Sequence, residues 1–408
     1  MQASDFKDIF NQSDSLIKFA QDISQIGGQC IIVGGSVRDI YLGMTSKDLD
    51  IEVHGISEMQ LEQMLGRHAK FKSVGRSFKV WKCRFKGMKE EIDCSIPCNE
   101  QGEPRPHIGF QAAAQRRDFT MNSMGYHIQS QTILDPLNGQ KDIEERIIRM
   151  TGPSQMQHDP LRFFRAVQFA ARFEMKIEES IIALAAETDF KQLSHERVRG
   201  ELEKLFLKSK DPCRGFDFAM QMGLFQSYLP DLNVEHLKSK GIAFNLLNES
   251  LDGERSDYIH LYWSLLFIET NEEDTINGLE LLGIVGHKAK RIAMLSQHCQ
   301  LMCEKKDDVE LKTIAESVCI ADLIVLAMTY FPDQKKEISI NQNNAIEANV
   351  YDAPLPPLLE GGVLYKMGYR GIEIRDMLNL IRIEQLNNRI QSPQEALLLL
   401  QSHPPGLQ

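Results

Sequence analysis

Short apolar runs separated by glycine turns fill the first 140 residues of the chain. Residues 30–33 (CIIV) form an apolar run that ends at Gly34-Gly35, and residues 48–53 (DLDIEV) alternate polar and apolar positions. A period of two is typical of strands with one buried face. By the same pattern, further strands are expected at residues 78–85, 91–96, 124–128 and 132–134, the last closing a hairpin.

A short helix is predicted directly after the two glycines, in the segment SVRDIYLG. Ser36 is expected to cap its first turn with its side chain, and Gly43 to end it. A strand–turn–helix of this kind presents main-chain N–H groups to a phosphate, and Arg38 lies one turn into the helix. The alternative is a tight turn followed by a surface arginine.

From residue 142 onward the apolar positions recur three and four residues apart, which is typical of helices. Helices are predicted over residues 160–173, 178–187, 196–207, 215–222, 258–269, 286–304, 371–390 and 393–401. Pro354, Pro356 and Pro357 interrupt the pattern before the last two. The chain is therefore predicted to be an α+β protein, with a mixed N-terminal module followed by helices alone.

Composition and charge restrict the class of protein. The 408 residues are 42% hydrophobic and 25% charged, with a net charge of −11 and eight cysteines that include no CxxC pair. These proportions are those of a globular protein without a disulfide scaffold. The longest apolar runs fall short of the ~20 residues that a membrane span needs, and the N-terminus carries acids where a signal peptide has basic residues. We expect a cytoplasmic protein without membrane contact.

Two groups of charged residues are candidates for chemistry. Asp48 and Asp50 lie two apart on a predicted strand, so both project from one face, where a divalent cation would neutralise them. Asp159, Arg162 and Arg165 are spaced three apart on a predicted helix and share one face. For this second group the spacing alone also fits a helix cap followed by solvated arginines.

Five ordered motifs carry a family resemblance. They are GGSVRDIYLGMTSKDLDIEV (34–53), RRDFTMNSM (116–124), DPLNGQKDIEERIIR (135–149), HDPLRFFRAVQFAAR (158–172) and HERVRGELEKLF (195–206). Together they resemble the class II nucleotidyltransferases, which include tRNA CCA-adding enzymes and bacterial poly(A) polymerases. The resemblance covers about residues 28–230 and implies a polymerase-beta-like nucleotidyltransferase head, followed by a helical neck, body and tail.

The resemblance also implies site residues and a cofactor. Asp48 and Asp50 would bind two Mg²⁺ ions that activate an RNA 3′-hydroxyl and neutralise charge on the phosphates. Asp93, on a strand where the family often has a third acid, would be a further catalytic carboxylate. The nucleotide-binding residues implied for the head are Gly34, Gly35 and Arg38 at the triphosphate, with Arg117 and Asp118 near phosphates and ribose.

For the neck, the resemblance implies that Asp159 and Arg162 choose the base, with Arg165 on the same nucleotide-binding face. An aspartate accepts from the exocyclic amine of CTP or ATP, and an arginine donates to the adjacent ring acceptor. UTP and GTP present the opposite pattern. Two residues depart from the family pattern: His158 replaces a glutamate, and Gln168 replaces an arginine that is expected to face phosphate.

The expected activity is addition of CCA to the tRNA 3′ end without a template, with tRNA, CTP and ATP as partners. Alternatives are a poly(A) polymerase, an enzyme that adds only CC or only A, a metal-dependent phosphohydrolase, and an inactive RNA-binding module. The resemblance implies that a poly(A) polymerase would carry a strongly basic C-terminal tail for generic RNA binding. Residues 365–390 hold only five basic residues against three acidic ones, which favours tRNA as the substrate. The expected domains are the head (1–140), the neck (141–232), the body (233–350) and the tRNA-binding tail (351–408).

Overall fold

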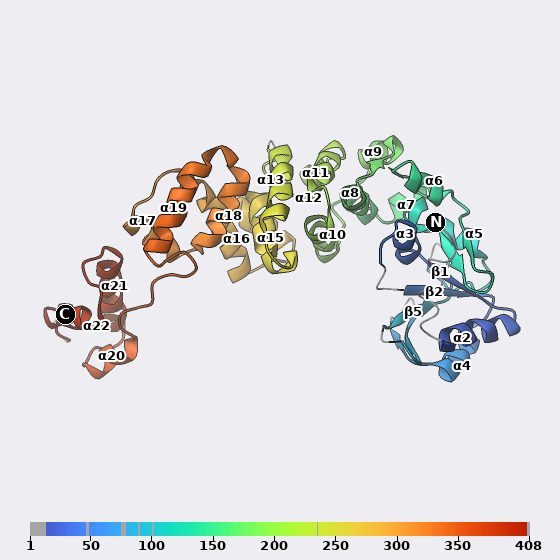
Figure 1. Ribbon diagram of the computed structural model, residues 1–408, viewed down its shortest axis with the longest axis horizontal. Coiled ribbons are helices and arrows are strands. Elements are labelled where there is room, and N and C mark those ends of the chain that lie inside the picture. Colours follow the sequence, from blue (N-terminus) through green and yellow to red (C-terminus); the bar gives the residue numbers. More distant parts are fainter. Residues whose placement is uncertain are drawn as a thin grey trace. The chain divides into compact units, whose positions relative to one another are not determined.

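The structure is a computed structural model that describes residues 14–45, 49–74, 79–88, 90–99, 102–234 and 236–405. The chain divides into two compact units, Met1–Tyr228 (unit 1) and Leu229–Gln408 (unit 2), whose elements are labelled in Figure 1. In the part of the chain that the structure describes, no helix has the length and apolar character that a membrane span requires. The four predicted domain boundaries remain predictions.

Unit 1 begins with a seven-stranded sheet in the order β3-β4-β5-β2-β1-β6-β7. Its strands are β1 Gln29–Val33, β2 Leu49–His54, β3 Ala69–Val74, β4 Val80–Phe85, β5 Ile92–Ser95, β6 Gly125–His127 and β7 Thr132–Leu134. Among the described residues of this sheet, the β2–β5 pair is parallel and the other pairs are antiparallel. The structure confirms the predicted strands to within a few residues at the ends that it describes. The alternation did not predict β3, whose residues are mostly exposed.

The two faces of the sheet differ in character. Ile51, Cys94 and Trp81 are paired across β2, β5 and β4, and all three are fully buried. Helices α2 (Asp14–Gln25) and α4 (Glu58–His68) cover this apolar face: the Phe19 ring of α2 meets Phe85 edge-on, and Trp81 Nε1 donates to Glu62 of α4. Alternation therefore leaves the opposite face for polar side chains.

Helix α3 (Gly35–Tyr41) follows β1 through a glycine turn. Gly34 occupies the N-cap position with φ +76°, a conformation that side-chain-bearing residues rarely adopt, and no side chain caps the helix. The prediction that Ser36 caps the helix is wrong, because the Ser36 hydroxyl donates to the Val33 carbonyl at 3.1 Å instead. Gly43, at φ +72°, follows the helix end as predicted.

The rest of unit 1 is mostly helical. Its elements are α5 Phe110–Gln115, η1 Thr120–Asn122, α6 Gly139–Glu144, β8 Ile147–Ile148, α7 Pro153–His158, α8 Leu161–Phe173, β9 Lys176–Ile177, α9 Glu179–Ala185, α10 His195–Lys208, α11 Pro212–Gln221 and α12 Leu224–Tyr228. Helix α8 packs against α10 and α11. A Cβ at Gly215 of α11 would lie 2.5 Å from Leu205 and 3.1 Å from Ala171, so this close approach requires glycine.

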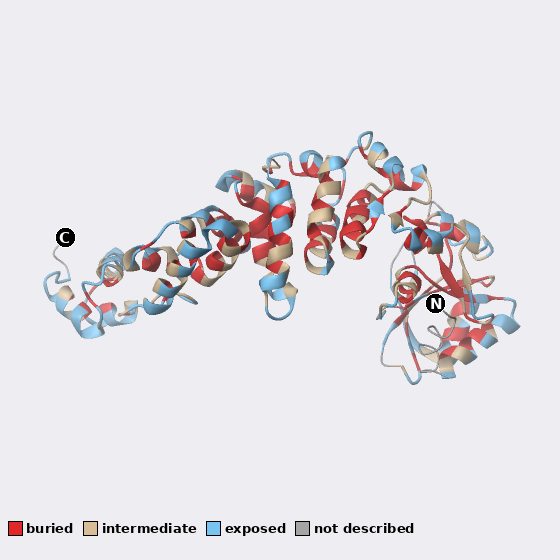
Figure 2. Ribbon diagram, turned by 45° about the horizontal axis from the view of Figure 1, so that its top comes forward, coloured by how far each residue is buried: buried red, intermediate tan, exposed pale blue. Residues whose placement is uncertain are grey.

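Unit 2 consists of helices. They are α13 Leu237–Ser250, η2 Arg255–Tyr258, α14 Ile259–Phe267, α15 Glu272–Leu281, α16 His287–His298, η3 Cys299–Cys303, α17 Asp308–Ala315, α18 Ile320–Tyr330, η4 Pro332–Gln334, α19 Lys335–Glu347, α20 Gly361–Lys366, α21 Ile372–Leu386 and α22 Pro393–Gln401. Helix α14 is almost entirely buried and packs against α13, α16 and α18. Figure 2 colours the buried residues of the chain red.

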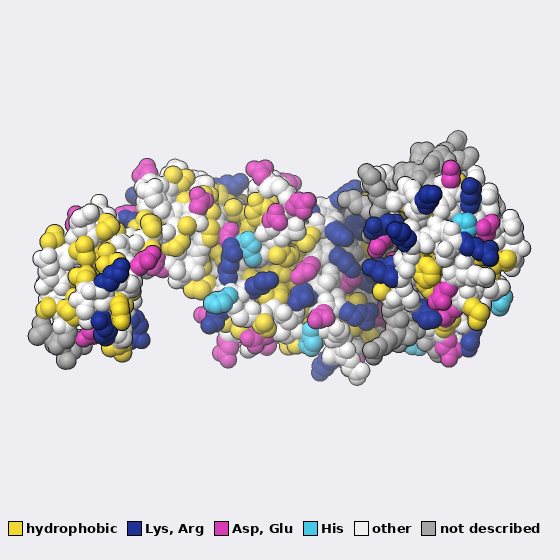
Figure 3. Space-filling model, turned by 90° about the horizontal axis from the view of Figure 1, so that it is seen from below, with side chains coloured by type: hydrophobic (Ala, Val, Ile, Leu, Met, Phe, Trp, Pro, Cys, Tyr) yellow, Lys and Arg dark blue, Asp and Glu magenta, His cyan; other side chains and the backbone are white. Residues whose placement is uncertain are grey.

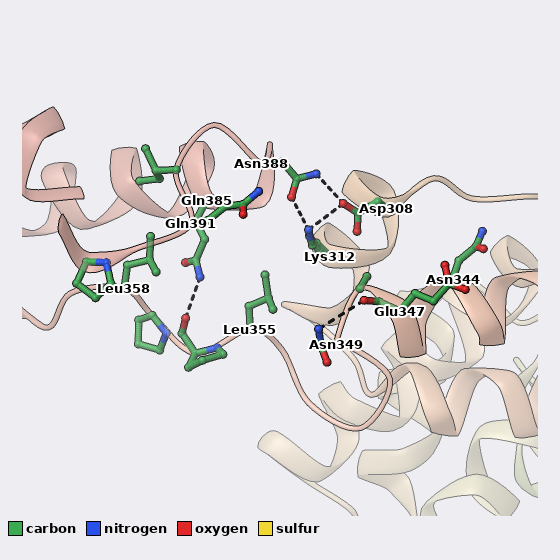
Figure 4. A pocket seen from close by; sticks show the side chains of 15 residues that line it. Asp308, Lys312, Asn344, Glu347, Asn349, Leu355, Leu358, Gln385, Asn388 and Gln391 are labelled. Carbon is green, nitrogen blue, oxygen red and sulfur yellow. Dashed lines mark hydrogen bonds and ion pairs between the residues drawn. The ribbon is translucent and has the colours of Figure 1, made fainter. Parts of the chain in front are cut away.

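The last three helices, α20 to α22, form a tail with its own small core around Leu364, Tyr369 and Ile381. Polar contacts join this tail to α17 (Figure 4). Arg382 donates to both carboxylate oxygens of Glu316, and its Nε lies 2.8 Å from Glu316 Oε2. Arg382 also donates to the main-chain carbonyl of Leu355. The junction also encloses a polar pocket of about 920 Å³, which Asp308, Lys312, Asn388 and the proline segment line.

Candidate active site

The polar face of the sheet brings two acidic side chains together. In the parallel β2–β5 pair, Asp50 lies directly opposite Asp93, so both carboxylates project from the same face of neighbouring strands. Asp50 is exposed, and the Asp93 carboxylate contacts Lys82 Nζ of β4 at 3.3 Å. Asp48 lies outside the residues that the structure describes. The register thus supports the placement of Asp93 beside Asp50 that the sequence suggested.

The glycine turn lies beside these carboxylates. A Cβ built on Gly34 would be 3.1 Å from Arg117 Nη1 and 3.9 Å from Asp50 Oδ2. A Cβ on Gly35 would be 3.3 Å from Arg38 Nη2. Two arginine side chains and one carboxylate therefore surround the turn, and a side chain at either glycine would fill the space at the strand end.

Arg38 is buried rather than open to solvent. Its guanidinium donates to Asp39 at 2.6 and 2.8 Å and to Asn122 Oδ1 at 2.6 Å, and it lies over the rings of Phe169 and Phe173. Burial lowers the pKa of Arg38, and Asp39 opposes that shift. The sequence predicted the position of Arg38 beside the turn, but it did not predict these partners.

Asp118 continues the same network. Its Oδ1 accepts from the Phe119 N–H and from Asn122 Nδ2, and its Oδ2 accepts from Arg165 of α8 at 2.7 and 2.8 Å. Burial by itself would raise the pKa of Asp118, but Arg165 and these hydrogen bonds outweigh it and lower the pKa. Arg38, Asn122, Asp118 and Arg165 thus form one continuous chain of charged and polar contacts from α3 to α8.

Arg162 and Asp159 do not contact each other through their side chains. The Arg162 guanidinium donates to the main-chain carbonyls of Arg117 and Arg116, at 3.0 and 3.1 Å. Asp159 Oδ2 accepts from Arg197 of α10 at 2.7 Å. Arg162 therefore supports the segment that carries Arg117, and Arg197 is the arginine bound to Asp159.

The alternative in which Asp159 caps α8 is wrong. The N-cap position belongs to Pro160, and no side chain caps the helix. Asp159, His158 and Arg197 instead line a pocket of about 480 Å³, whose other wall is the segment between α9 and α10. Asp159 therefore lines a pocket and accepts from Arg197, and it does not complete the hydrogen bonding of its helix.

Gln168 stands in α8 where the family pattern has an arginine. Its side chain is buried within α8, with the residue only 2% exposed, and its Nε2 has no hydrogen-bond partner among the described residues. The expectation that an arginine at position 168 faces phosphate remains a prediction. Replacement of arginine by glutamine is consistent with this burial, because an uncompensated buried charge costs several kcal/mol.

Several residues of the site were not singled out from the sequence. Glu52 accepts from Arg117 at 2.8 Å, and Asn122 and Arg197 complete the contacts of Arg38 and Asp159. For Glu52 a signal was present, since it continues the alternation that places Asp50 on the polar face. Among the residues that the structure describes, no three His, Cys, Asp or Glu side chains form a cluster that could hold a metal ion.

Two family descriptions match the chain. Residues 30–149 match the "Poly A polymerase head domain", and residues 172–235 match the "Probable RNA and SrmB- binding site of polymerase A". Poly(A) polymerase I of Salmonella typhi is 31% identical over 183 residues, which are 40% of this chain and 38% of that protein. Multifunctional CCA protein of Mannheimia succiniciproducens is 34% identical over 219 residues, or 50% of each chain. The chain thus spans half or less of these relatives.

Solved structures match over a longer range. The CCA-adding enzyme of Bacillus stearothermophilus in complex with CTP has a TM-score of 0.73 at 17% identity, covering 95% of this chain and 97% of that one. The Thermotoga maritima CCA-adding enzyme complexed with tRNA has a TM-score of 0.69 at 19% identity, covering 95% and 94%. Identities this low establish a shared fold. Together with the two matched domains, the curated relatives and the ordered motifs, this shared fold supports the resemblance of the chain to the class II nucleotidyltransferases, the family of CCA-adding enzymes and poly(A) polymerases.

Proposed function

We propose that this protein is a template-independent nucleotidyltransferase that adds CCA to the 3′ end of tRNA from CTP and ATP. The observation that carries the proposal is the pairing of Asp50 with Asp93 on the polar face, next to the Gly34 turn and Arg117. Carboxylates beside a phosphate-sized turn with a nearby arginine are what transfer of a nucleotidyl group from a triphosphate requires.

The donor set at this strand end suits Mg²⁺. Oxygen ligands from one or two carboxylates, completed by phosphates and water, are what this ion prefers. Asp50 and Asp93 are opposite one another on adjacent strands, and we assign them to the site together with Asp48. When bound, the metal supplies neutralisation of the charge on the reacting phosphates.

The residues around the turn would bind the nucleotide's phosphates and ribose. Gly34 and Gly35 leave room for a phosphate to approach the main chain, and Arg117 Nη1 lies at the same turn. Asp118 and Arg165 are already paired at 2.7 Å, so the nucleotide would meet them as a pre-organised ion pair rather than as two mobile side chains. The buried Arg38 guanidinium, which lies beside Gly35, would add its positive charge to the same phosphate site.

Base choice is assigned to the start of α8. Asp159 lines the pocket there, and its carboxylate is the acceptor that an exocyclic amine of CTP or ATP requires. The contact between Asp159 and Arg197 adds a second arginine beside Arg162 that could donate to the neighbouring ring acceptor. His158 lines the same pocket in place of the family's glutamate.

The tail supports a tRNA substrate over generic RNA. Of its basic residues, Arg382 binds Glu316, Arg389 binds Glu384, and Arg375 contacts Asp376. Hydrophobic side chains reach the tail surface at the left of Figure 3, and Tyr365, Ile372, Ile383 and Leu398 are each more than half exposed. Such a surface offers little of the salt-dependent backbone attraction on which sequence-independent RNA binding depends.

A direct assay tests the proposal. A tRNA ending at its discriminator base is incubated with Mg²⁺ and with CTP, ATP, UTP and GTP, singly and mixed, and the 3′ end is sequenced. We expect C, C and A in order. Only CC or only A indicates a partial enzyme, and long adenosine tracts on unstructured RNA indicate a poly(A) polymerase. No addition under any condition contradicts the nucleotidyltransferase assignment and leaves the RNA-binding alternative. Release of inorganic phosphate instead indicates a phosphohydrolase.

A further inference from the structure

Glu52 is a buried carboxylate on the same strand face as Asp50, two residues further along β2. Its neighbours across the sheet are Ile31 and Ser95, which cannot neutralise a charge. The residue is only 2% exposed. A buried carboxylate is costly unless it is paired and hydrogen-bonded, so its partners indicate why it is tolerated.

Those partners are the two arginines of the RRD motif. Arg117 Nη2 donates to Glu52 Oε1 at 2.8 Å, and Arg116 Nη2 lies 3.5 Å from the same oxygen. His54 Nε2 lies 3.3 Å from Oε2 but is not aligned for a hydrogen bond. Burial would raise the pKa of Glu52, but Arg117, His54 and Arg116 outweigh it and lower the pKa to about 2. The two arginines thus compensate the charge of the buried carboxylate.

The two ends of the Arg117 guanidinium point to different groups. Nη2 binds Glu52, whereas Nη1 lies 3.1 Å from the position of a Cβ on Gly34. Asp50 Oδ2 is 3.9 Å from that same position. One amino group is thus held by the buried carboxylate, and the other is directed at the turn where the triphosphate is expected.

Few polar contacts orient the Arg117 guanidinium. Within the described part of the chain, Glu52 Oε2, Arg116 Nε, Arg117 Nε and both ring nitrogens of His54 are buried without a hydrogen-bond partner. Arg162 and Thr151 bind the main-chain carbonyl of Arg117, but not its guanidinium. Glu52 Oε1 is therefore the main polar contact that orients the Arg117 side chain.

We propose that Glu52 is a positioning residue that holds Arg117 at the Gly34 turn so that its guanidinium meets the triphosphate of the incoming nucleotide. The inference rests on the proposed function, and it adds to that function a residue that is not among the eight positions expected to bind nucleotide. Glu52 itself contacts neither substrate nor metal in this assignment. Its negative charge would repel a triphosphate, so the orientation of Arg117 must outweigh that repulsion.

The Glu52→Gln variant distinguishes the orientation of Arg117 from the repulsion of the triphosphate, because loss of each effect changes the nucleotide KM in the opposite direction. Glutamine keeps the shape of the side chain and removes its charge. Loss of the charge-assisted bond should raise the nucleotide KM roughly tenfold while kcat changes less than twofold. If Glu52 acted only as a nearby negative charge, the same variant would lower the nucleotide KM. If its role were only to support the fold, the thermal midpoint would fall and the KM would not rise.

A double-mutant cycle with Arg117→Ala completes the test. In that background Glu52→Gln should change the nucleotide KM less than twofold, because there is no guanidinium left to orient. A KM that falls or is unchanged in the single variant overturns the inference, and so does an equal rise in the Arg117→Ala background. The matched control is Glu91→Gln, since Glu91 is an exposed glutamate directly before β5 that contacts an arginine, Arg84 of β4, at 3.4 Å.

The failure of this inference can be told apart from failure of the proposed function. The KM is measured with whichever nucleotide and RNA the wild type uses, so CCA, CC or adenosine addition all serve. Equilibrium binding of a non-hydrolysable CTP analogue gives a second measurement, and Glu52→Gln should weaken it to the same extent. A wild type that adds no nucleotide contradicts the proposed function, whereas an unweakened analogue in Glu52→Gln contradicts the positioning role alone.

Discussion

In unit 1 half-buried arginines bind buried carboxylates from other elements of the candidate site, whereas in unit 2 a buried lysine binds main-chain carbonyls. Arg165 of α8 binds Asp118, and Arg117 binds Glu52 of β2. Lys240 of α13, which is fully buried, donates to the carbonyls of Asn233 at 3.1 Å and Leu266 at 2.9 Å. Both arrangements satisfy buried charges, but with partners of different kinds.

The difference concerns what a ligand can change. An arginine and a carboxylate within one site can exchange partners when a charged nucleotide arrives, because each partner is itself a recognition group. A lysine that donates to two main-chain carbonyls only connects the segments of the chain that carry those carbonyls. We therefore expect substitutions in the first set to alter activity with little effect on stability, and substitutions in unit 2 to do the opposite.

The largest effect is expected for Asp50→Ala. Loss of this carboxylate should lower nucleotide incorporation at least a hundredfold, because the metal-binding pair with Asp93 is broken. Binding of tRNA, measured by filter binding, and the thermal midpoint should stay near those of the wild type. Residual incorporation above about 1% of wild type would show that the metal ligands are misassigned. Asp48→Ala is expected to behave in the same way.

The Lys240→Met variant tests the opposite arrangement in unit 2. Burial lowers the pKa of Lys240 to about 8, so the unfolded chain binds this proton more tightly between about pH 8 and 10.5. The free energy of unfolding of the wild type should rise with pH across that window, relative to Lys240→Met, by up to about 3 kcal/mol. Denaturant titrations at several pH values measure the difference, and Lys238→Met, on the exposed side of the same helix, is the control. A difference that does not depend on pH would contradict the assignment.

Asp159→Ala should narrow base selectivity. The substitution leaves Arg197 without its partner and removes the acceptor for the exocyclic amine, so use of CTP and ATP should fall by roughly one to two orders of magnitude. Use of UTP and GTP should fall less than use of CTP and ATP. Steady-state incorporation of all four nucleotides measures this, and Arg197→Ala should give a smaller loss in the same direction. An equal loss for all four nucleotides would show that Asp159 does not read the base.

The smallest effect is expected at the junction between the tail and α17. Arg382→Met removes the Glu316 and Leu355 contacts and should destabilise unit 2 by about 1 kcal/mol, which lowers the thermal midpoint by roughly 2–4 °C. Arg389→Met, which removes only a contact with Glu384 at the end of the preceding helix α21, should leave the midpoint unchanged. Single-nucleotide incorporation at saturating RNA should stay the same in both variants. If Arg382→Met lowers single-nucleotide incorporation instead, the junction takes part in catalysis, and the expected difference between substitutions in unit 1 and unit 2 is wrong.

The sequence predicted the strands and helices of the site because their signals are local. Alternation in DLDIEV placed Asp50 on a strand face, and the glycines after CIIV placed a turn at its end. The burial of Gln168 was not predicted, because motif spacing assigns a residue to a helix but not the depth at which that residue is buried. Ser36 failed as a cap because its hydroxyl had a nearer acceptor in the Val33 carbonyl.

By itself, then, the sequence determined the fold class, the family resemblance and the strand face that carries Asp50, since each depends on periodicity or on residues close together in the chain. Only the tertiary structure decided which arginine meets which carboxylate. Arg117 and Glu52 are 65 residues apart, and Arg165 and Asp118 are 47 apart. The physical reason is that an ion pair depends on distance in space and on burial, and neither leaves a periodic trace in the chain when its partners come from separate elements.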